Sequence, residues 1–193
     1  MANVDSPFGA SAINSSDSGD YHAKGREVEF LASDDTAAFI GDPVKLTGTA
    51  GADGYTPVVE VASPGDAIIG FLHALAPTFE DEGSLTLNYR LASTARKGYV
   101  TMGADVLFVM QEDSDGGALT AADAGLNVDF VAGPGDTITG LSGFEIDSST
   151  ADTTATLPLR LRRVAPEQDN ELGDNANWVV NINANQDDHG LGV

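Results

Sequence analysis

Cysteine is absent from the chain, and basic residues are few. The lack of cysteine excludes a disulfide scaffold, a thiolate zinc site and a cysteine nucleophile. Nine Lys and Arg stand against 30 Asp and Glu, which gives a formal net charge of −21. Such a surface repels phosphate backbones, so we expect no nucleic-acid partner. The acidity is compatible with simple solubility, with adaptation to high salt, or with carboxylates that collect divalent cations.

Long apolar runs are also missing. No segment approaches the ~20 consecutive apolar residues that a membrane helix needs, so we expect no membrane partner. The opening MANVDSPFGA has neither the basic region nor the apolar core of a signal peptide. We therefore expect a protein that is cytosolic at synthesis, or one that leaves the cell by a route other than Sec.

Helical periodicity is nearly absent, whereas short alternating runs bounded by Gly and Pro are frequent. Ten or more such runs in one chain predict an all-β protein, with a single β-sandwich or barrel-like body of many short strands. One helical turn is expected at residues 120–124, with Thr120 as N-cap and Gly125 as the stop. Two further predictions are a strand at Leu85–Ala92 that alternates apolar and polar faces, and a hairpin-like pair formed by Tyr99–Met102 and Val106–Gln111.

Two stretches of the chain repeat each other. VVEVASPGDAIIGF (58–71) and VDFVAGPGDTITGL (128–141) are identical at eight of fourteen positions. Each reads as an apolar run, a Pro-Gly-Asp turn and a second apolar run, which predicts a β-corner used twice. In both copies Pro and Gly fit the two central positions of a type II turn, where Gly tolerates a positive φ. The offset of 70 residues predicts two similar halves that share one core.

Composition divides the chain into three parts. Residues 1–26 are small, polar and without period, and they predict an extended N-terminal arm. This arm is either a frayed terminus or a segment that orders against a partner. Residues 27–186 form the all-β body, and residues 187–193 form a flexible tail. The apolar side chains that could anchor the arm are Phe8, Ile13 and Tyr21.

Recognisable catalytic motifs are missing, and we expect no enzyme, no catalytic residue and no cofactor. The histidines at 22, 73 and 189 are scattered, and His73 is expected in the core or at an interface. A glycosidase would need paired carboxylates in an aromatic-lined cleft, and one Trp and four Tyr offer few stacking platforms. The acidic stretch 112–117 resembles the start of a calcium loop. The fifth position from Asp113 is a glycine rather than a ligand, so we expect no metal-binding residues and a solvated turn.

One basic feature stands out against the acidic background. Arg160, Arg162 and Arg163 lie in one predicted strand and make up a third of the Lys and Arg. Strand alternation places Arg160 and Arg162 on one face, with apolar neighbours opposite. One interpretation is a strand face paired with acids of the same chain, which contributes little stability. The other is a contact to an acidic neighbouring subunit, because Arg is favoured at interfaces.

Several short blocks resemble one family along nearly the full length of the chain. The opening MANVDSPFG with FIGDPVKLTGTA (39–50), then ARKGYVTMGADVLFVMQED (95–113), and ANWVVNINANQ (176–186) resemble the head decoration proteins of tailed bacteriophages, also called capsid cement proteins. The resemblance implies a virion structural protein that binds the outer face of the major capsid protein lattice and stabilises the head. It also implies a homotrimer, assembly in the host cytoplasm, and contacts to the capsid or to neighbouring subunits through the arm anchors and the three arginines.

The Asp-rich loops leave one alternative open. A calcium-dependent acidic β-module of a surface-layer or adhesin protein would have a similar composition.

Overall fold

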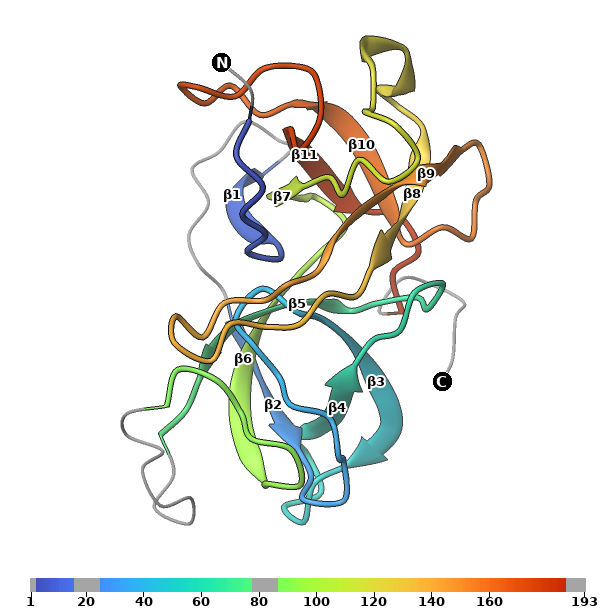
Figure 1. Ribbon diagram of the computed structural model, residues 1–193. Helices are drawn as coiled ribbons and strands as arrows, with labels where there is room; N and C mark the ends of the chain where they lie inside the picture. The colour runs from blue at the N-terminus through green and yellow to red at the C-terminus, as the bar shows by residue number, and fades with distance from the viewer. Residues whose placement is uncertain (1–2, 16–24, 78–86, 187–193) are drawn as a thin grey trace.

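The computed structural model describes residues 3–15, 25–77 and 87–186, and they are built almost entirely from β-strands (Figure 1). This confirms the prediction of an all-β fold. The strands form two sheets in two stacked lobes. The predicted helical turn is present as the short 3-10 helix η1 (Ala121–Asp123), with Thr120 and Asp123 forming a capping box. No helix in the described part of the chain is long and apolar enough to cross a membrane.

The lower lobe in Figure 1 is a closed barrel with the strand order β2-β4-β3-β5-β6. Val28 and Phe30 alternate with charged residues along β2, and both are fully buried in the barrel core. Closure hydrogen-bonds every strand of this lobe on both sides, so the barrel has no open edge. Its strands are β2 (Gly25–Phe30), β3 (Pro43–Ala50), β4 (Pro57–Val61), β5 (Gly70–Leu75) and β6 (Arg96–Met102).

The upper lobe is a six-stranded sheet with the order β1-β7-β11-β10-β8-β9. The sheet curls, because Glu112, just after β7, forms a parallel bridge with Ile146 of β9. Inside the curl lies a second core around the fully buried Trp178. The strands are β1 (Ser11–Ser15), β7 (Val106–Gln111), β8 (Asn127–Val131), β9 (Glu145–Asp152), β10 (Leu159–Val164) and β11 (Asn177–Ile182).

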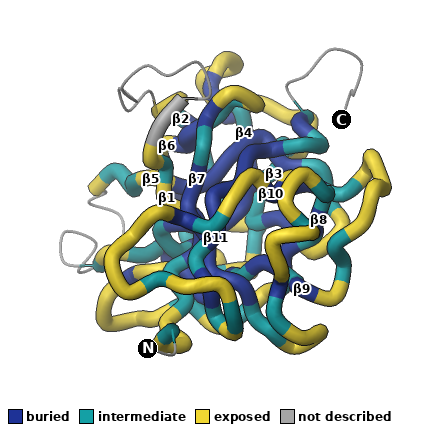
Figure 2. Tube along the Cα trace, turned by 90° about the horizontal axis from the view of Figure 1, so that it is seen from above, coloured by how far each residue is buried: buried dark blue, intermediate teal, exposed yellow. Residues whose placement is uncertain are grey.

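The two lobes pack on each other through apolar side chains. Phe71 of the barrel lies 4.7 Å, ring centre to ring centre, from Phe108 of the sheet. Phe71 and Ile68 both belong to the core of the upper lobe. Figure 2 shows the buried segments in the middle of the molecule and the exposed ones in the outer loops.

The predicted pairing of Tyr99–Met102 with Val106–Gln111 is wrong. β6 pairs with β2 and β5 inside the barrel, whereas β7 pairs with β1 and β11 in the sheet. Both edges of β6 are therefore occupied when the barrel closes. The turn between them does not make a hairpin but carries the chain from one lobe to the other.

The repeated sequence falls once in each lobe, but its two copies fold differently. At the first corner the N–H of Asp66 donates to Ser63 O at 3.0 Å, and Gly65 has φ +86°, as a type II turn requires. Gly135 in the second copy is outside the left-handed region, so the prediction of a positive φ there is wrong. A Cβ on Gly135 would lie 2.3 Å from the ring of Phe39, so glycine is needed there for space. Of the residues that follow, 137–139 form a turn and Leu141 forms a single bridge to Ile40, rather than the predicted second run of strand.

The strand predicted at Leu85–Ala92 is also wrong for the described residues 87–92, which are irregular apart from one bridge to Ala38. Alternation predicted a solvent-facing Arg90, yet its side chain is fully buried. Its guanidinium donates to the carbonyl oxygens of four loop residues and pairs with the Asp34 carboxylate at 2.9 Å. Arg96 donates in the same way to Tyr89 O at 2.7 Å and Leu87 O at 3.2 Å. A buried guanidinium with five donors satisfies loop carbonyls that have no strand partner.

The described part of the arm lies on its own chain. β1 adds an edge strand beside β7, antiparallel to it. Asn3 donates to Glu171 O at 2.8 Å, and Gln111 both accepts from the Ser6 N–H at 2.8 Å and donates to Val4 O at 2.9 Å. The described residues 3–15 of the arm thus lie along the upper lobe, and β1 adds the edge strand of its sheet. Tyr21 and the tail 187–193 lie outside the described residues.

Candidate functional site

A mainly apolar groove lies where the arm crosses the junction of the two lobes. Its volume is about 350 Å³. The arm contributes four of its lining residues, the barrel and its connections contribute others, and residues of the upper lobe close it. Its large apolar lining residues are Phe8, Ile13, Ile40, Leu72, Val109 and Leu141. The structure therefore brings together two of the predicted contact residues, Phe8 and Ile13, at one site.

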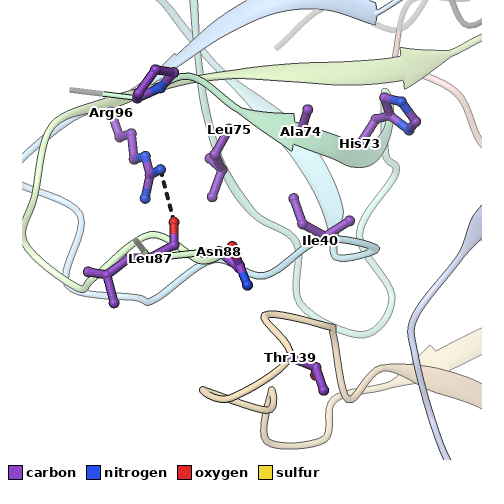
Figure 3. Close-up of a pocket in the computed structure, with 9 residues that line it drawn as sticks. Ile40, His73, Ala74, Leu75, Leu87, Asn88, Arg96 and Thr139 are labelled. Carbon is purple, nitrogen blue, oxygen red and sulfur yellow. Dashed lines mark hydrogen bonds between the residues drawn. The ribbon is translucent and has the colours of Figure 1, made fainter. Parts of the chain in front are cut away.

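A second hollow of about 580 Å³ adjoins this groove, since Ile40 and His73 line both. Figure 3 shows its wall formed by the end of β5, with Arg96 reaching across to the carbonyl oxygen of Leu87. Thr139 lies on the facing loop. The two hollows together extend along the junction on both sides of Ile40.

Backbone hydrogen bonds hold the centre of the groove rigidly. The N–H of Ile40 donates to Gly140 O at 2.9 Å, and its carbonyl accepts from the N–H of Ser142 at 2.9 Å. On the other side, the N–H of Ala10 donates to Gly41 O at 3.0 Å. The arm comes so close that a Cβ on Gly9 would lie 2.5 Å from Gly41 O. Small residues at this crossing therefore fix the arm against the wall.

Exposed apolar side chains mark the rim of the groove. On this rim the side chain of Ile13 is 41% exposed and that of Leu141 is 39% exposed. The loop that carries Leu141 is well ordered by hydrogen bonds, since Asp136 accepts from the N–H of Ile138 at 2.8 Å and from the Thr139 hydroxyl at 2.9 Å. Exposed apolar groups on a rigid support are typical of binding surfaces.

The groove has little charge and no catalytic constellation among the described residues. Asp42, beneath it, is 2% exposed and accepts from the N–H of Phe39 at 2.8 Å. Burial raises the pKa of Asp42 to about 6, against the lowering effect of bonds from Ser142 and Phe39. His73 lies exposed on the rim rather than in the core, and Glu167 also lines the groove. The Ser142 side chain bonds the Asp42 carboxylate, and among the described residues no hydrogen bond joins His73 to a hydroxyl group or to either carboxylate.

The three predicted arginines lie elsewhere, on β10. All three are exposed, and a β-bulge between Leu161 and Arg163 turns two consecutive arginines to solvent. Arg160 Nε donates to Gly125 O at 3.2 Å, and Arg162 Nε donates to Asn181 Oδ1 at 2.6 Å. Within the described residues none of the three forms an ion pair with a carboxylate. The interpretation of this strand as paired with the chain's own acids is therefore not supported there.

Acidic side chains gather where β7 meets β9. Burial, together with the carboxylates of Asp5, Asp113 and Asp115, raises the pKa of Glu145 to about 7. The neighbouring Glu112 is fully buried: its Oε2 accepts from the N–H of Leu119 at 2.8 Å, and its Oε1 has no described partner. Burial raises the pKa of Glu112 to about 7 as well. We call the outward-facing set Asp5, Asp113, Asp115 and Glu145 the acidic seam.

The acidic stretch 112–117 is a structural turn in this fold. Asp113 Oδ1 accepts from the N–H of Ser148 at 3.0 Å, from its hydroxyl at 2.8 Å, and from the N–H of Asp115 at 3.2 Å. These bonds fix the turn against β9. Among the residues that the structure describes, no group of three or more His, Asp or Glu is arranged to hold a metal ion.

Sequence reasoning missed Ile40, Leu141 and His73 as neighbours at one site. They come from a loop, a turn in the second corner and β5, so no local pattern connects them. The two glycines at the crossing, Gly9 and Gly41, are 32 positions apart, and nothing local in the sequence indicates that they meet. Comparison of the chain with known protein families, with curated proteins and with solved structures found no match.

Proposed function

We propose that this protein is a virion structural protein that binds the outer surface of a bacteriophage capsid lattice and stabilises the head. The observation that carries the proposal is the rigid apolar groove at the lobe junction, whose rim exposes Ile13 and Leu141. The sequence blocks that resemble decoration proteins support the same function.

The groove suits an extended apolar segment of the major capsid protein. Its wall is preformed by backbone hydrogen bonds, so binding would order the incoming segment without reorganising the receptor. Apolar side chains at the centre of such a contact supply most of the binding free energy, while polar rims set specificity.

The remaining parts of the proposal follow from the same assignment. The partners are the major capsid protein and further copies of this chain, with a homotrimer as the proposed assembly. The location is the capsid exterior, after synthesis in the host cytoplasm. A net charge of −21 suits a protein that must stay soluble and must not bind the packaged genome. No enzyme activity, cofactor, nucleic acid or membrane is part of this function.

Co-sedimentation with undecorated, expanded capsids tests the proposal. We expect saturable binding of the wild-type chain and at least ~tenfold weaker binding of Ile13→Asp with Leu141→Asp, because charges in an apolar groove are costly to desolvate. Ile138→Asp is the matched control: this side chain is 87% exposed on the same loop but does not line the groove. No saturable binding of the wild type, or equal loss in the control, would contradict the proposal.

A calcium titration separates the alternative of an acidic β-module. The Asp113 carboxylate already accepts bonds from Ser148 and Asp115, so we expect little change in melting temperature when calcium is added. A large rise in melting temperature that a chelator reverses would favour the calcium-dependent module instead.

A further inference from the structure

The outer face of β10 carries positive charge that no described carboxylate neutralises through an ion pair. Leu159 and Leu161 point into the core of the upper lobe, which turns Arg160 outward. The bulge exposes Arg162 and Arg163 beside it. The two described lysines, in contrast, are paired: Lys45 with Asp66 at 2.7 Å and Lys97 with Glu27 at 2.6 Å. We call the three exposed arginines the arginine strip.

The acidic seam carries the opposite charge, and it is equally uncompensated. Ile146 points into the core, so its neighbour Glu145 faces outward, and Asp5 and Asp115 are exposed beside it. Their mutual repulsion contributes to the raised pKa of Glu145. No Lys or Arg within the described residues forms an ion pair with any member of the seam.

The topology keeps these two surfaces apart within one chain. In the order β7-β11-β10-β8-β9, β10 is the middle strand, with one strand between it and each end. The two ends, β7 and β9, approach each other at the bridge between Glu112 and Ile146. β10 therefore lies across the curled sheet from the acidic seam, and their outer faces point away from each other. One copy cannot pair them, but two copies can.

We propose that the arginine strip of one copy binds the acidic seam of a second copy, in a head-to-tail contact. Guanidinium groups bind carboxylates with two parallel hydrogen bonds, so three arginines match a row of acids better than lysines would. Because the two surfaces differ, the contact is heterologous, and it produces a closed ring if the rotation between copies closes. Because the contact does not involve the capsid, its test is independent of the capsid-binding test of the groove.

Sedimentation velocity of the purified full chain at neutral pH and physiological salt tests the contact. We expect wild-type assemblies larger than a monomer. Arg160→Glu with Arg162→Glu and Arg163→Glu should weaken self-association by about tenfold or more, because each pair is lost and replaced by repulsion. If this charge-reversal variant has a lower melting temperature than the wild type, the variant with all three arginines replaced by Gln is measured in its place.

The complementary variant separates specific pairing from net charge. Asp5→Arg with Asp115→Arg makes the chain less acidic, so general repulsion between copies falls. If net charge alone controlled self-association, this variant would associate more strongly than the wild type. The head-to-tail contact predicts the opposite, namely that self-association weakens by about the same factor as in the arginine variant. Mixing the two variants brings the intact arginine strip of one against the intact acidic seam of the other, and the new glutamates against the new arginines, so the mixture should regain association. A chain that combines both sets of changes restores opposite charges across the contact and should regain association.

Three outcomes would overturn the inference. One is a wild-type chain that stays monomeric, with a dissociation constant weaker than about 1 mM. Another is a seam variant that associates as strongly as the wild type or more strongly. The third is a combined variant that folds, as judged by circular dichroism, but fails to regain association.

Discussion

Replacing Glu112 with Gln should remove a large part of the pH dependence of stability. The Glu112 side chain is fully buried, one carboxylate oxygen accepts from the N–H of Leu119, and the other has no described partner. Burial raises the pKa of this carboxyl from 4.5 to about 7 in the folded protein. The folded state therefore binds a proton more tightly than the unfolded chain does.

The sign of the effect follows from this difference. Below pH 4.5 the group is protonated in both states and costs no stability. As the pH rises to about 7, the unfolded chain ionises Glu112 first, so folding becomes less favourable. Above pH 7 the full difference applies, and the rise in pKa from 4.5 to about 7 corresponds to about 3 kcal/mol. The wild-type chain should thus lose stability between mildly acidic and neutral pH.

Urea unfolding at several pH values, from mildly acidic to mildly alkaline, measures this effect. The free energy of unfolding of Glu112→Gln, relative to that of the wild type, should increase by about 3 kcal/mol as the pH rises across this range. The slope is the diagnostic quantity, because an unpaired amide N–H of the new Gln costs the same at every pH. Glu167→Gln is the matched control, since this exposed carboxylate bonds only the Asn177 amide at 2.9 Å among described partners. Parallel pH curves for the wild type and Glu112→Gln would refute the reasoning.

Four further substitutions test the fold by thermal or urea unfolding. Arg90→Met should destabilise by about 3 kcal/mol or more, because it leaves the Asp34 carboxylate and several loop carbonyls unpaired in a buried site; a loss under about 1 kcal/mol would contradict this. Gly65→Asn should be nearly neutral, since Asn accepts a positive φ and the space is open, whereas Gly135→Asn should cost about 2 kcal/mol through collision with the Phe39 ring; equal effects would show that the two corners are alike. Thr120→Ala removes the N-cap of η1 and should cost about 1 kcal/mol, and no change would mean that the turn folds without its cap.

Local chemistry accounts for the features that could be predicted. Alternation along β2 placed Val28 and Phe30 inside, and the structure buries both completely. Turn chemistry identified Gly65, and capping chemistry identified Thr120. Each of these depends on neighbours within a few residues in the chain, which the sequence displays directly.

The failed predictions share a different cause. Arg90 belongs to a run that alternates like a strand, but its guanidinium is drawn inside by carbonyls more than fifty residues away in sequence. Gly135 repeats the motif of Gly65, but the ring of Phe39 packs on it and a different turn results. In both cases a distant partner overrode the local preference. The groove residues were missed for the same reason, since the lobes bring them together only after folding.

By itself, the sequence determined an acidic, cysteine-free, all-β chain with a repeated Pro-Gly-Asp motif, because charge, composition and period are local properties. Only the tertiary structure decided that the strands divide into a closed barrel and a curled sheet, since strand partners are chosen by long-range pairing. The same pairing placed Phe8 and Ile13 in one groove and set the arginine strip across the curl from the acidic seam. Those placements depend on how the two sheets close, and sheet closure cannot be predicted from any short stretch of sequence.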